Sequence, residues 1–473
     1  MDVKRRQVDD DRQLSLFDDN ALASPCHGAS GEGGTRPAAC EASQASAAWD
    51  PGRALTACLM EEVCRRDNLN EAYRRVKTNR GAPGVDGMTV AELAHWLKEH
   101  RETLIASLLD GSYQPQPVRG VQIPKPGGGV RQLGIPTVVD RLVQQAILQV
   151  LDPLLDPTLS ASSYGFRSGR SAHDALAAAR QYVAEGRVIV VDLDLEKFFD
   201  RVNHDILMAR LARRILDKRL LRIIRRFLQA GMMSNGVCVE REEGTPQGGP
   251  LSPLLANLLL DDLDKELEKR GHRFCRYADD CNIYVQSKAA GERVLASVTR
   301  FLESKLKLRV NREKSAVAFV QERKFLGYRL LVGGGLGLAP VSLQRVRDRI
   351  RQITRRNRGV SLDRMISELN SFLTGWVTYF RHAACRNHLG DLDSWLRRKL
   401  RCVRLKQCKR VQTIADFLQR LNVPSRRAWM TAACGQGWWR MAKLPAANEA
   451  LSVRWFMGQG LINLVGRHAA LQH

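Results

Sequence analysis

The stretch that decides the fold is Tyr277-Ala278-Asp279-Asp280, which places two adjacent carboxylates at a tight turn. The flanking segments, Phe274-Cys275-Arg276 and Ile283-Tyr284-Val285, are short and apolar and favour strands, so the acidic pair is predicted at a hairpin tip. An Asp-Asp pair in a turn is usually solvated turn chemistry. Adjacent carboxylates between strands are also oxygen ligands for hard divalent cations, and three other segments favour this second interpretation.

The first of these segments is Val188-Ile189-Val190-Val191-Asp192-Leu193-Asp194, followed by Phe198-Phe199-Asp200. A β-branched run that ends in a carboxylate indicates a buried strand that delivers an acid to the sheet edge. Two Mg²⁺ ions about 3.5–4 Å apart need oxygen ligands that two neighbouring strands can supply. One ion would activate a 3′-hydroxyl and the other would neutralise leaving pyrophosphate. Asp192 and Asp194 share a strand face, so spacing alone leaves both as candidate ligands.

The second segment is a glycine-rich loop that leads into a helix, Gly244-Thr245-Pro246-Gln247-Gly248-Gly249-Pro250-Leu251-Ser252-Pro253. Ser252 is predicted as the N-cap, with Pro253 at the first helical position. An apolar stripe at four-residue spacing follows, made of Leu255, Leu259, Leu263 and Leu267. The glycines allow a substrate to approach the backbone closely, although a loop that merely enters a core helix would look the same.

The third segment, Ile123-Pro124-Lys125-Pro126-Gly127-Gly128-Gly129-Val130-Arg131, predicts two strands joined by a turn with a cation on each arm. Lys125 and Arg131 could converge on a triphosphate. Basic residues that flank a turn are more often simply solvated.

Taken together and in this order, these segments resemble the reverse transcriptases encoded by bacterial group II introns. The resemblance covers about residues 55–470. It extends to further family blocks, namely Asn79–Gly87, Gly134–Arg141, Ser163–Arg167 and the primer-grip segment Phe325-Leu326-Gly327-Tyr328.

The resemblance implies a role for each candidate residue. The metal-binding acid of the family lies six residues before the Asp that closes the Phe-Phe-Asp element, which is Asp194 here, and Asp279 and Asp280 complete the catalytic triad. Phe199 matches the family's steric gate against a ribose 2′-hydroxyl. The remaining deoxynucleotide-binding positions are Lys125 and Arg131 at the triphosphate, Gln247 in the nucleotide pocket, and Lys314 as the proton donor to pyrophosphate.

Charge agrees with a polyanionic partner. The 473 residues carry a formal net charge of +24. Residues 341–420 contain 19 Lys and Arg against 6 Asp and Glu, so they hold +13 of that charge. The cations alternate with an apolar helical stripe at Ile366, Leu369, Leu373, Trp376 and Phe380. The segment Leu369–Phe380 resembles the maturase (X) domain of the family, which also serves as the polymerase thumb and binds intron RNA.

The last fifty residues combine cations with tryptophans, in Arg426-Arg427-Ala428-Trp429 and Gly437-Trp438-Trp439-Arg440. This composition suits stacking on bases, and a small apolar module closed by tryptophans is an equal alternative. The 11 cysteines include no Cys-x-x-Cys pair, which argues against the zinc site of an appended nuclease and favours reduced thiols.

Residues 1–50 are rich in Ala, Ser, Gly and Asp and are expected to be disordered. Within them lies a peptide that resembles the sliding-clamp-binding motif of bacterial replication proteins, with Gln13, Leu14, Leu16 and Phe17 as its contact residues. No signal-peptide h-region and no membrane-spanning run occurs, so the expected location is the bacterial cytoplasm, at the nucleoid.

The resemblance implies an α+β fold of the right-hand polymerase type, with an antiparallel palm sheet. The predicted domains are a tail (1–50), fingers and palm (55–330), a helical thumb/maturase domain (335–423) and a small DNA-binding module (424–473). The expected function is an RNA-directed DNA polymerase and maturase that binds intron RNA, template RNA, primer or target DNA and dNTPs, and supports retrohoming. Two alternatives are a reverse transcriptase domesticated for DNA repair or phage defence, and a polymerase-dead splicing factor. Dimerisation is left open.

Overall fold

The computed structural model describes residues 56–124, 128–234, 237–239, 241 and 243–472. Two compact units are distinguished along the chain. The first comprises the described residues up to Ala175 together with Val191–Ile283 and Ala289–Ala316, and the second comprises Leu176–Val190, Tyr284–Lys288 and the chain from Val317 onward. Lys125 and the predicted clamp peptide lie outside the described residues.

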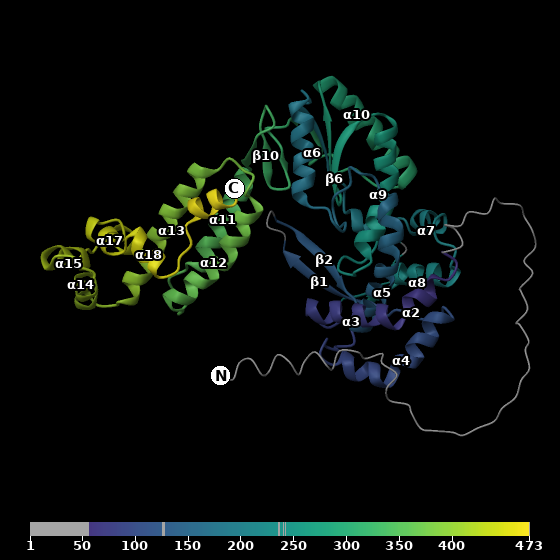
Figure 1. Ribbon diagram of the computed structural model, residues 1–473, viewed down its shortest axis with the longest axis horizontal. Helices are drawn as coiled ribbons and strands as arrows, with labels where there is room; N and C mark the ends of the chain where they lie inside the picture. The colour runs from purple at the N-terminus through teal and green to yellow at the C-terminus, as the bar shows by residue number, and fades with distance from the viewer. Residues whose placement is uncertain (1–55, 125–127, 235–236, 240, 242, 473) are drawn as a thin grey trace, which may run out of the picture. The chain divides into compact units, whose positions relative to one another are not determined.

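The N-terminal part of the first unit is helical. Helix α5 (Val138–Leu155) packs against α2 (Leu59–Cys64) and α3 (Arg66–Asn79), and α8 (Lys218–Gln229) contacts α2 and α4 (Leu93–Leu109) (Figure 1). The start of α8 is tied to α2, because the capping residue Asp217 accepts hydrogen bonds from the N–H groups of Leu220 and, 3.0 Å away, Met60.

A ribbon of short strands adjoins these helices. Strand β1 (Val118–Pro124) pairs antiparallel with β2 (Val130–Ile135), which confirms the predicted pair of strands, and Ile123 lies opposite Arg131. On its other side β1 pairs in parallel with β4 (Met232–Ser234), which pairs with β5 (Val237–Val239).

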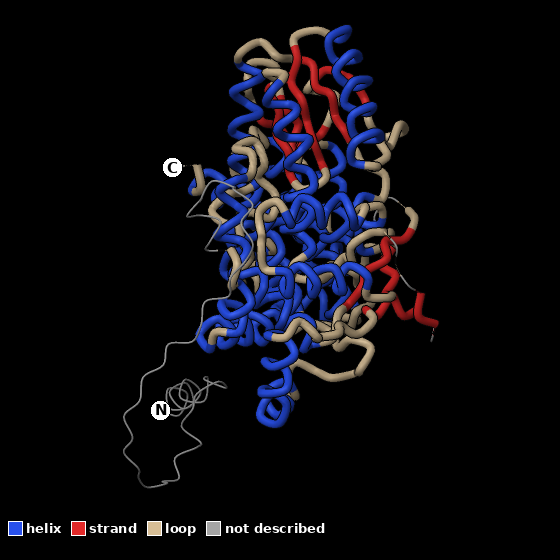
Figure 2. Tube along the Cα trace, turned by 90° about the vertical axis from the view of Figure 1, so that its right-hand side faces the viewer, coloured by secondary structure: helices blue, strands red, loops and turns tan. Residues whose placement is uncertain are grey.

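A second sheet has the strand order β6-β7-β3-β8, from β6 (Arg273–Tyr277), β7 (Asp280–Val285), β3 (Ile189–Leu193) and β8 (Ala316–Phe319). The predicted hairpin with the acidic pair at its tip is therefore confirmed as β6 and β7. Helix α9 (Ser252–Lys269) packs against β6 and α7 (His204–Ala212), and its predicted leucine stripe is buried. Figure 2 shows this sheet and the β1–β2 ribbon as separate groups of strands. Helix α10 (Lys288–Phe301) follows β7.

In the second unit, helix α6 (Ala172–Ala184) is linked to a three-stranded sheet by the Arg180 guanidinium, which donates to the Gly334 carbonyl. The strands are β9 (Lys324–Phe325), β10 (Tyr328–Leu330) and β11 (Leu336–Leu338). The β9–β10 turn is the predicted primer-grip segment, and its left-handed residues are Leu326 (φ 51°) and Gly327 (φ 81°). The Tyr379 hydroxyl donates to the Leu326 carbonyl at 2.8 Å and fixes this turn to a helix.

The rest of the second unit is helical. Helix α12 (Leu362–Tyr379) confirms the predicted amphipathic helix, with Ile366, Leu369 and Leu373 buried and Trp376 half-buried. It packs between α11 (Pro340–Ile353) and α13 (Arg386–Gln407). The smaller helices that follow are α14 (Val411–Arg420), α15 (Ser425–Ala432), α16 (Trp438–Met441), α17 (Pro445–Ala450), α18 (Val453–Gly458) and α19 (Leu464–Ala470).

The C-terminal segment is fastened to helix α13 by buried polar contacts. The Asp393 carboxylate on α13 accepts from the backbone N–H of Leu464, which begins α19. The Arg401 side chain donates to the Leu451 carbonyl at 2.9 Å. Helix α19 packs on both α12 and α13. A module boundary at residue 424 therefore stays a prediction, and the structure shows contacts that cross it.

A buried cap fixes the start of α5, where the first unit carries one of the family blocks. Thr137 is the N-cap, and the Asp140 N–H donates to its hydroxyl. The Asp140 carboxylate accepts from the hydroxyls of Thr137 (2.7 Å) and Tyr113 (2.8 Å) and from the Gln116 N–H (3.2 Å). Burial nevertheless raises the pKa of Asp140 to about 6, against the opposing effect of these hydrogen bonds.

We expect Asp140 to make the stability of the fold pH-dependent. A buried carboxyl with a raised pKa binds its proton more tightly in the folded chain, so its contribution to stability is complete below pH 3.8 and is lost as the pH rises to about 6. In Asp140→Asn, this titration is absent. The free energy of unfolding of the variant, relative to wild type, should therefore rise by about 2 kcal/mol between pH 4 and 6, measured by denaturant titration. A constant difference across this range would contradict the assignment.

Candidate active site

The turn between β6 and β7 is held in an unusual backbone conformation. Ala278 has φ 58°, a left-handed value that costs a non-glycine residue about 1–2 kcal/mol. Gly165 packs directly beneath it, because a Cβ atom at Gly165 would lie 2.3 Å from the Ala278 nitrogen. This close approach explains why the segment Ser163–Arg167 has a glycine at position 165, because a larger residue there would clash with the backbone of the turn.

The fully buried side chain of Arg276 holds the same turn by a hydrogen bond. Arg276 is completely inaccessible to solvent, and its guanidinium forms an ion pair with the equally inaccessible Asp264 of α9 at 2.6 Å. The guanidinium also donates to the Ala278 carbonyl (2.9 Å) and to the side chains of Asn257 (3.0 Å) and Ser163 (2.7 Å). The left-handed turn is therefore anchored to α9 through one side chain.

Asp194 immediately follows β3 and is held through its backbone. Its N–H donates to the Ser315 hydroxyl at 3.0 Å, and its carbonyl accepts from the Asn311 N–H at 2.9 Å. The same segment brings the ammonium nitrogen of Lys314 to 3.8 Å from an Asp194 carboxylate oxygen. The structure thus places two of the predicted site residues together, although Lys314 is 64% exposed and the pair itself adds little stability.

The carboxylates of Asp279 and Asp194 lie close enough to affect each other. The pKa of Asp279 is raised, first by burial and then by the negative charge of Asp194, while the Arg131 guanidinium lowers it. Strand β2 therefore places Arg131, the predicted triphosphate-binding residue, near enough to Asp279 for its positive charge to act on that carboxylate. Asp280, the first residue of β7, is exposed.

The available carboxylates fit a metal ion that takes some of its ligands from the substrate, and they do not form a site in which the protein supplies every ligand. Across the described residues, no group of three or more His, Cys, Asp and Glu side chains is arranged to hold a metal ion. Mg²⁺ in nucleotide-processing sites is usually held by one or two carboxylates together with substrate phosphates and water. Asp194 and Asp279 supply such a pair, and their mutual repulsion would be relieved by a cation.

The other predicted nucleotide-pocket residues lie on loops that are joined by backbone hydrogen bonds. The Thr245 N–H donates to the Phe199 carbonyl at 2.7 Å, and the Gly134 N–H of β2 donates to the Gln247 carbonyl at 2.9 Å. Both Phe199 and Gln247 are half-buried. The glycine-rich loop therefore bridges the segment after β3 and the β1–β2 ribbon.

One local prediction was wrong. Helix α9 begins at Ser252 itself with Leu251 as its N-cap, so Ser252 does not cap the helix. Its hydroxyl instead donates to the Pro246 carbonyl at 2.8 Å and accepts from the Thr245 hydroxyl at 3.0 Å. Ser252 therefore joins the start of α9 to the glycine-rich loop through hydrogen bonds. The capping pattern in the sequence does not indicate these contacts.

Comparison with known proteins decides the family. The family described as reverse transcriptase (RNA-dependent DNA polymerase) matches residues 123–330, and the group II intron maturase-specific domain matches residues 343–421. The protein YkfC of Escherichia coli K12 is 34% identical over 60% of this chain and 85% of its own length. The chain belongs to the group II intron-encoded reverse transcriptase/maturase family.

A second relative of this intron-encoded reverse transcriptase is itself named as a group II intron-encoded protein. The group II intron-encoded protein LtrA of Lactococcus lactis is 29% identical over 58% of this chain and 56% of its own length, so the chain spans about half of that relative. The matches establish a right-hand polymerase fold with a helical maturase domain and an RNA-directed DNA polymerase that depends on divalent metal and binds intron RNA. No helix in the described part of the chain is both long and apolar enough to span a membrane.

The residues that sequence reasoning missed in this reverse transcriptase are the supports of the catalytic turn. Arg276, Asp264, Asn257 and Ser163 were not predicted to act together. A signal was present in α9, because Asp261 and Asp264 interrupt its apolar face and are both buried. Buried acids on a leucine-rich helix require partners, and the arginine just before Tyr277 was the available cation.

Proposed function

We propose that the chain copies intron RNA into DNA by two-metal nucleotidyl transfer, with Asp194, Asp279 and Asp280 as the ligands of two Mg²⁺ ions. The observation that carries the proposal is that β7 and β3 are neighbouring strands, so that Asp279 at the turn before β7 and Asp194 directly after β3 carry acids at adjacent strands, with the charge of each affecting the other. When bound, the ions would supply positive charge that lowers the pKa of the primer 3′-hydroxyl and stabilises the departing pyrophosphate. Asp280 would join the set only if its exposed carboxylate reaches an ion when substrate is present.

The chain's own residues would position and select the nucleotide. Lys125 and Arg131 on the β1–β2 turn would bind the triphosphate, and Gln247 would contact the nucleotide from the glycine-rich loop. Lys314, held near Asp194, would donate a proton from its ammonium nitrogen to the leaving pyrophosphate. Phe199 would fill the space of a 2′-hydroxyl, and its ring is braced edge-on by Phe198 at 5.1 Å.

The assay that tests the proposal is extension of a DNA primer on an RNA template by the purified chain with Mg²⁺ and dNTPs. Template-dependent extension supports an active polymerase. Intron binding without any extension would favour the alternative of a polymerase-dead splicing factor. Whether the flanking DNA folds into a group II intron separates the mobile-element function, including retrohoming, from a domesticated role in repair or phage defence.

Replacing the proposed steric gate should relax sugar selection. In Phe199→Val, the ratio of ribonucleotide to deoxynucleotide incorporation should rise about 10²-fold, equivalent to ~3 kcal/mol of lost discrimination. Single-nucleotide primer extension with rNTP and dNTP measures the ratio. A core phenylalanine away from the site, Phe227 of α8, is buried and offers a control, because Phe227→Leu should lower stability and leave the ratio unchanged. Equal ratios in wild type and Phe199→Val would exclude the gate.

The peptide at Gln13–Phe17 gives a separate proposal about recruitment. Leu16 and Phe17 would enter an apolar pocket of the bacterial sliding clamp, with Gln13 and Leu14 alongside, and bring the protein to nascent DNA 3′ ends at the nucleoid. Leu16→Ala with Phe17→Ala should abolish binding of the full-length chain to purified clamp in an anisotropy assay, whereas Ser15→Ala should bind as wild type does. Undiminished clamp binding by the double variant would show that Leu16 and Phe17 do not mediate this contact.

A further inference from the structure

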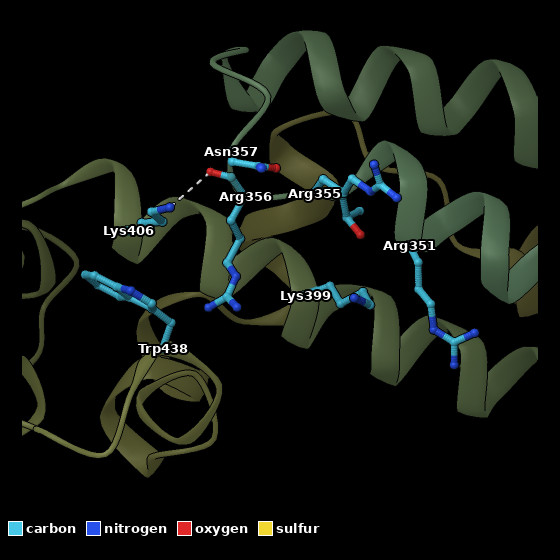
Figure 3. Close-up of a pocket in the computed structure, with 8 residues that line it drawn as sticks. Arg351, Arg355, Arg356, Asn357, Lys399, Lys406 and Trp438 are labelled. Carbon is cyan, nitrogen blue, oxygen red and sulfur yellow. Dashed lines mark hydrogen bonds between the residues drawn. The ribbon is translucent and has the colours of Figure 1, made fainter.

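A cationic cavity lies within the second unit, between the maturase helices and the C-terminal segment. Its volume is about 640 Å³. Figure 3 shows side chains reaching it from the end of α11, the loop before α12, helix α13 and helix α16. The lining residues are Arg351, Thr354, Arg355, Arg356, Asn357, Lys399, Lys406 and Trp438.

The charge in this cavity is not balanced by its own lining. Five of the eight lining side chains are cationic, and among these described residues none is acidic. Arg351 pairs with Asp348, which lies outside the lining, and Lys406 donates to the Arg356 carbonyl at 3.4 Å. The pKa of half-buried Lys399 is lowered, first by burial and then by the positive charge of Arg351. Cations gathered in this way favour an anionic occupant.

An aromatic side chain forms one wall of the cavity. Trp438 is half-buried, and its carbonyl accepts from the Cys402 thiol of α13 at 3.3 Å, which fixes the start of α16 against that helix. The next tryptophan has a different role, because the Arg398 guanidinium covers the Trp439 ring at 3.9 Å. Trp438 is therefore the tryptophan of this pair that lines the cavity.

We propose that this cavity binds an unpaired nucleotide within a nucleic-acid strand, with its phosphates on the Arg356 and Lys399 side and its base stacked on Trp438. Stacking on an aromatic ring beside a basic groove is the general mode of single-strand binding. More cations than one phosphate requires line the cavity, so a strand fits better than a free nucleotide. The inference rests on the proposed function and adds to it that the C-terminal segment completes a site on the maturase helices.

The test measures binding of single-stranded probes by the full-length protein. Fluorescence anisotropy with an oligouridylate RNA and an oligothymidylate DNA, each about ten nucleotides long, gives affinity over a range of salt concentrations. Arg356→Gln with Lys399→Gln should weaken binding about tenfold at about 0.15 M salt and reduce the slope of log K against log salt by about 1.4, since each lost phosphate contact removes about 0.7. Trp438→Ala should weaken binding about tenfold with little change in slope, and Trp438→Phe should retain most of the affinity.

A charge-matched control separates the cavity from general basicity. Lys409 and Arg410, just beyond α13, are exposed and do not line the cavity, so replacing both with Gln should change affinity less than twofold. A selective loss with RNA, with DNA or with both supports the proposal and identifies the strand. Equal losses in the cavity and control variants, or unchanged binding by Trp438→Ala, would overturn it. Primer extension by wild type is read separately, so its failure would overturn the polymerase and leave the cavity result standing.

Discussion

Asp279→Asn should abolish cDNA synthesis while leaving intron binding and splicing assistance largely intact. The carboxylate of Asp279 is the half-buried acid at the turn and the one coupled to Asp194. Losing a metal ligand removes several kcal/mol of charge stabilisation in the transition state, so the primer-extension rate should fall on the order of 10³-fold. Rapid-quench primer extension measures the rate, and a filter-binding assay with intron RNA measures the retained function.

Two further substitutions sharpen this result. Asp194→Asn should lose activity to a similar degree, whereas Asp192→Asn, two residues earlier on β3, should keep most of it, because the charge felt by Asp279 is that of Asp194. If Asp192→Asn were the inactive variant, the ligand assignment on β3 would be wrong. Joint loss of splicing and synthesis in Asp279→Asn at saturating protein would show that the two functions are not separable.

Arg276→Met should destabilise the first unit by about 3–5 kcal/mol, because it leaves the Asp264 carboxylate buried without its cation. Denaturant unfolding measures the loss. A control lies at the end of α9, the helix that carries Asp264: its C-cap residue Arg270 pairs with Glu266 near the surface, so Arg270→Met should cost no more than about 0.5 kcal/mol. Similar losses in both variants would contradict the importance of the buried pair.

A double variant separates stability from positioning. Arg276→Met combined with Asp264→Leu removes both charges and should recover much of the lost stability. The Ala278 carbonyl would still lack its donor, so primer extension should remain slow even where the protein is folded. Recovery of activity together with stability would mean that Arg276 stabilises the fold without positioning the turn.

Much of the fold could be predicted because its signals are local. The β6–β7 hairpin follows from two apolar runs around Asp279 and Asp280, and α12 follows from the spacing of Ile366, Leu369 and Leu373. The β-branched run before Asp194 likewise gives β3. In each case the pattern of side chains along a few residues is itself the cause of the structure.

The parts that could not be predicted depend on contacts between distant residues. Capping rules favoured Ser252 as an N-cap, but its hydroxyl is bound within the loop by Thr245 and the Pro246 carbonyl. The buried acids of α9 indicate that Asp264 needs a cation, but no local pattern indicates that Arg276 would also bind Ser163, more than 100 residues earlier in the chain. The cavity lined by Trp438 exists only because the C-terminal segment packs on α13. The assignment of individual site residues stays a prediction until variants are measured.

The most direct test of the central claim is anomalous diffraction from a crystal of the protein with an RNA template, a chain-terminated DNA primer, a matched dNTP and Mn²⁺. We expect two anomalous peaks about 3.5–4 Å apart, with Asp194 and Asp279 among the ligands and the triphosphate toward Arg131. Peaks that lie elsewhere, or a bound nucleotide with neither Asp194 nor Asp279 as a metal ligand, would contradict it.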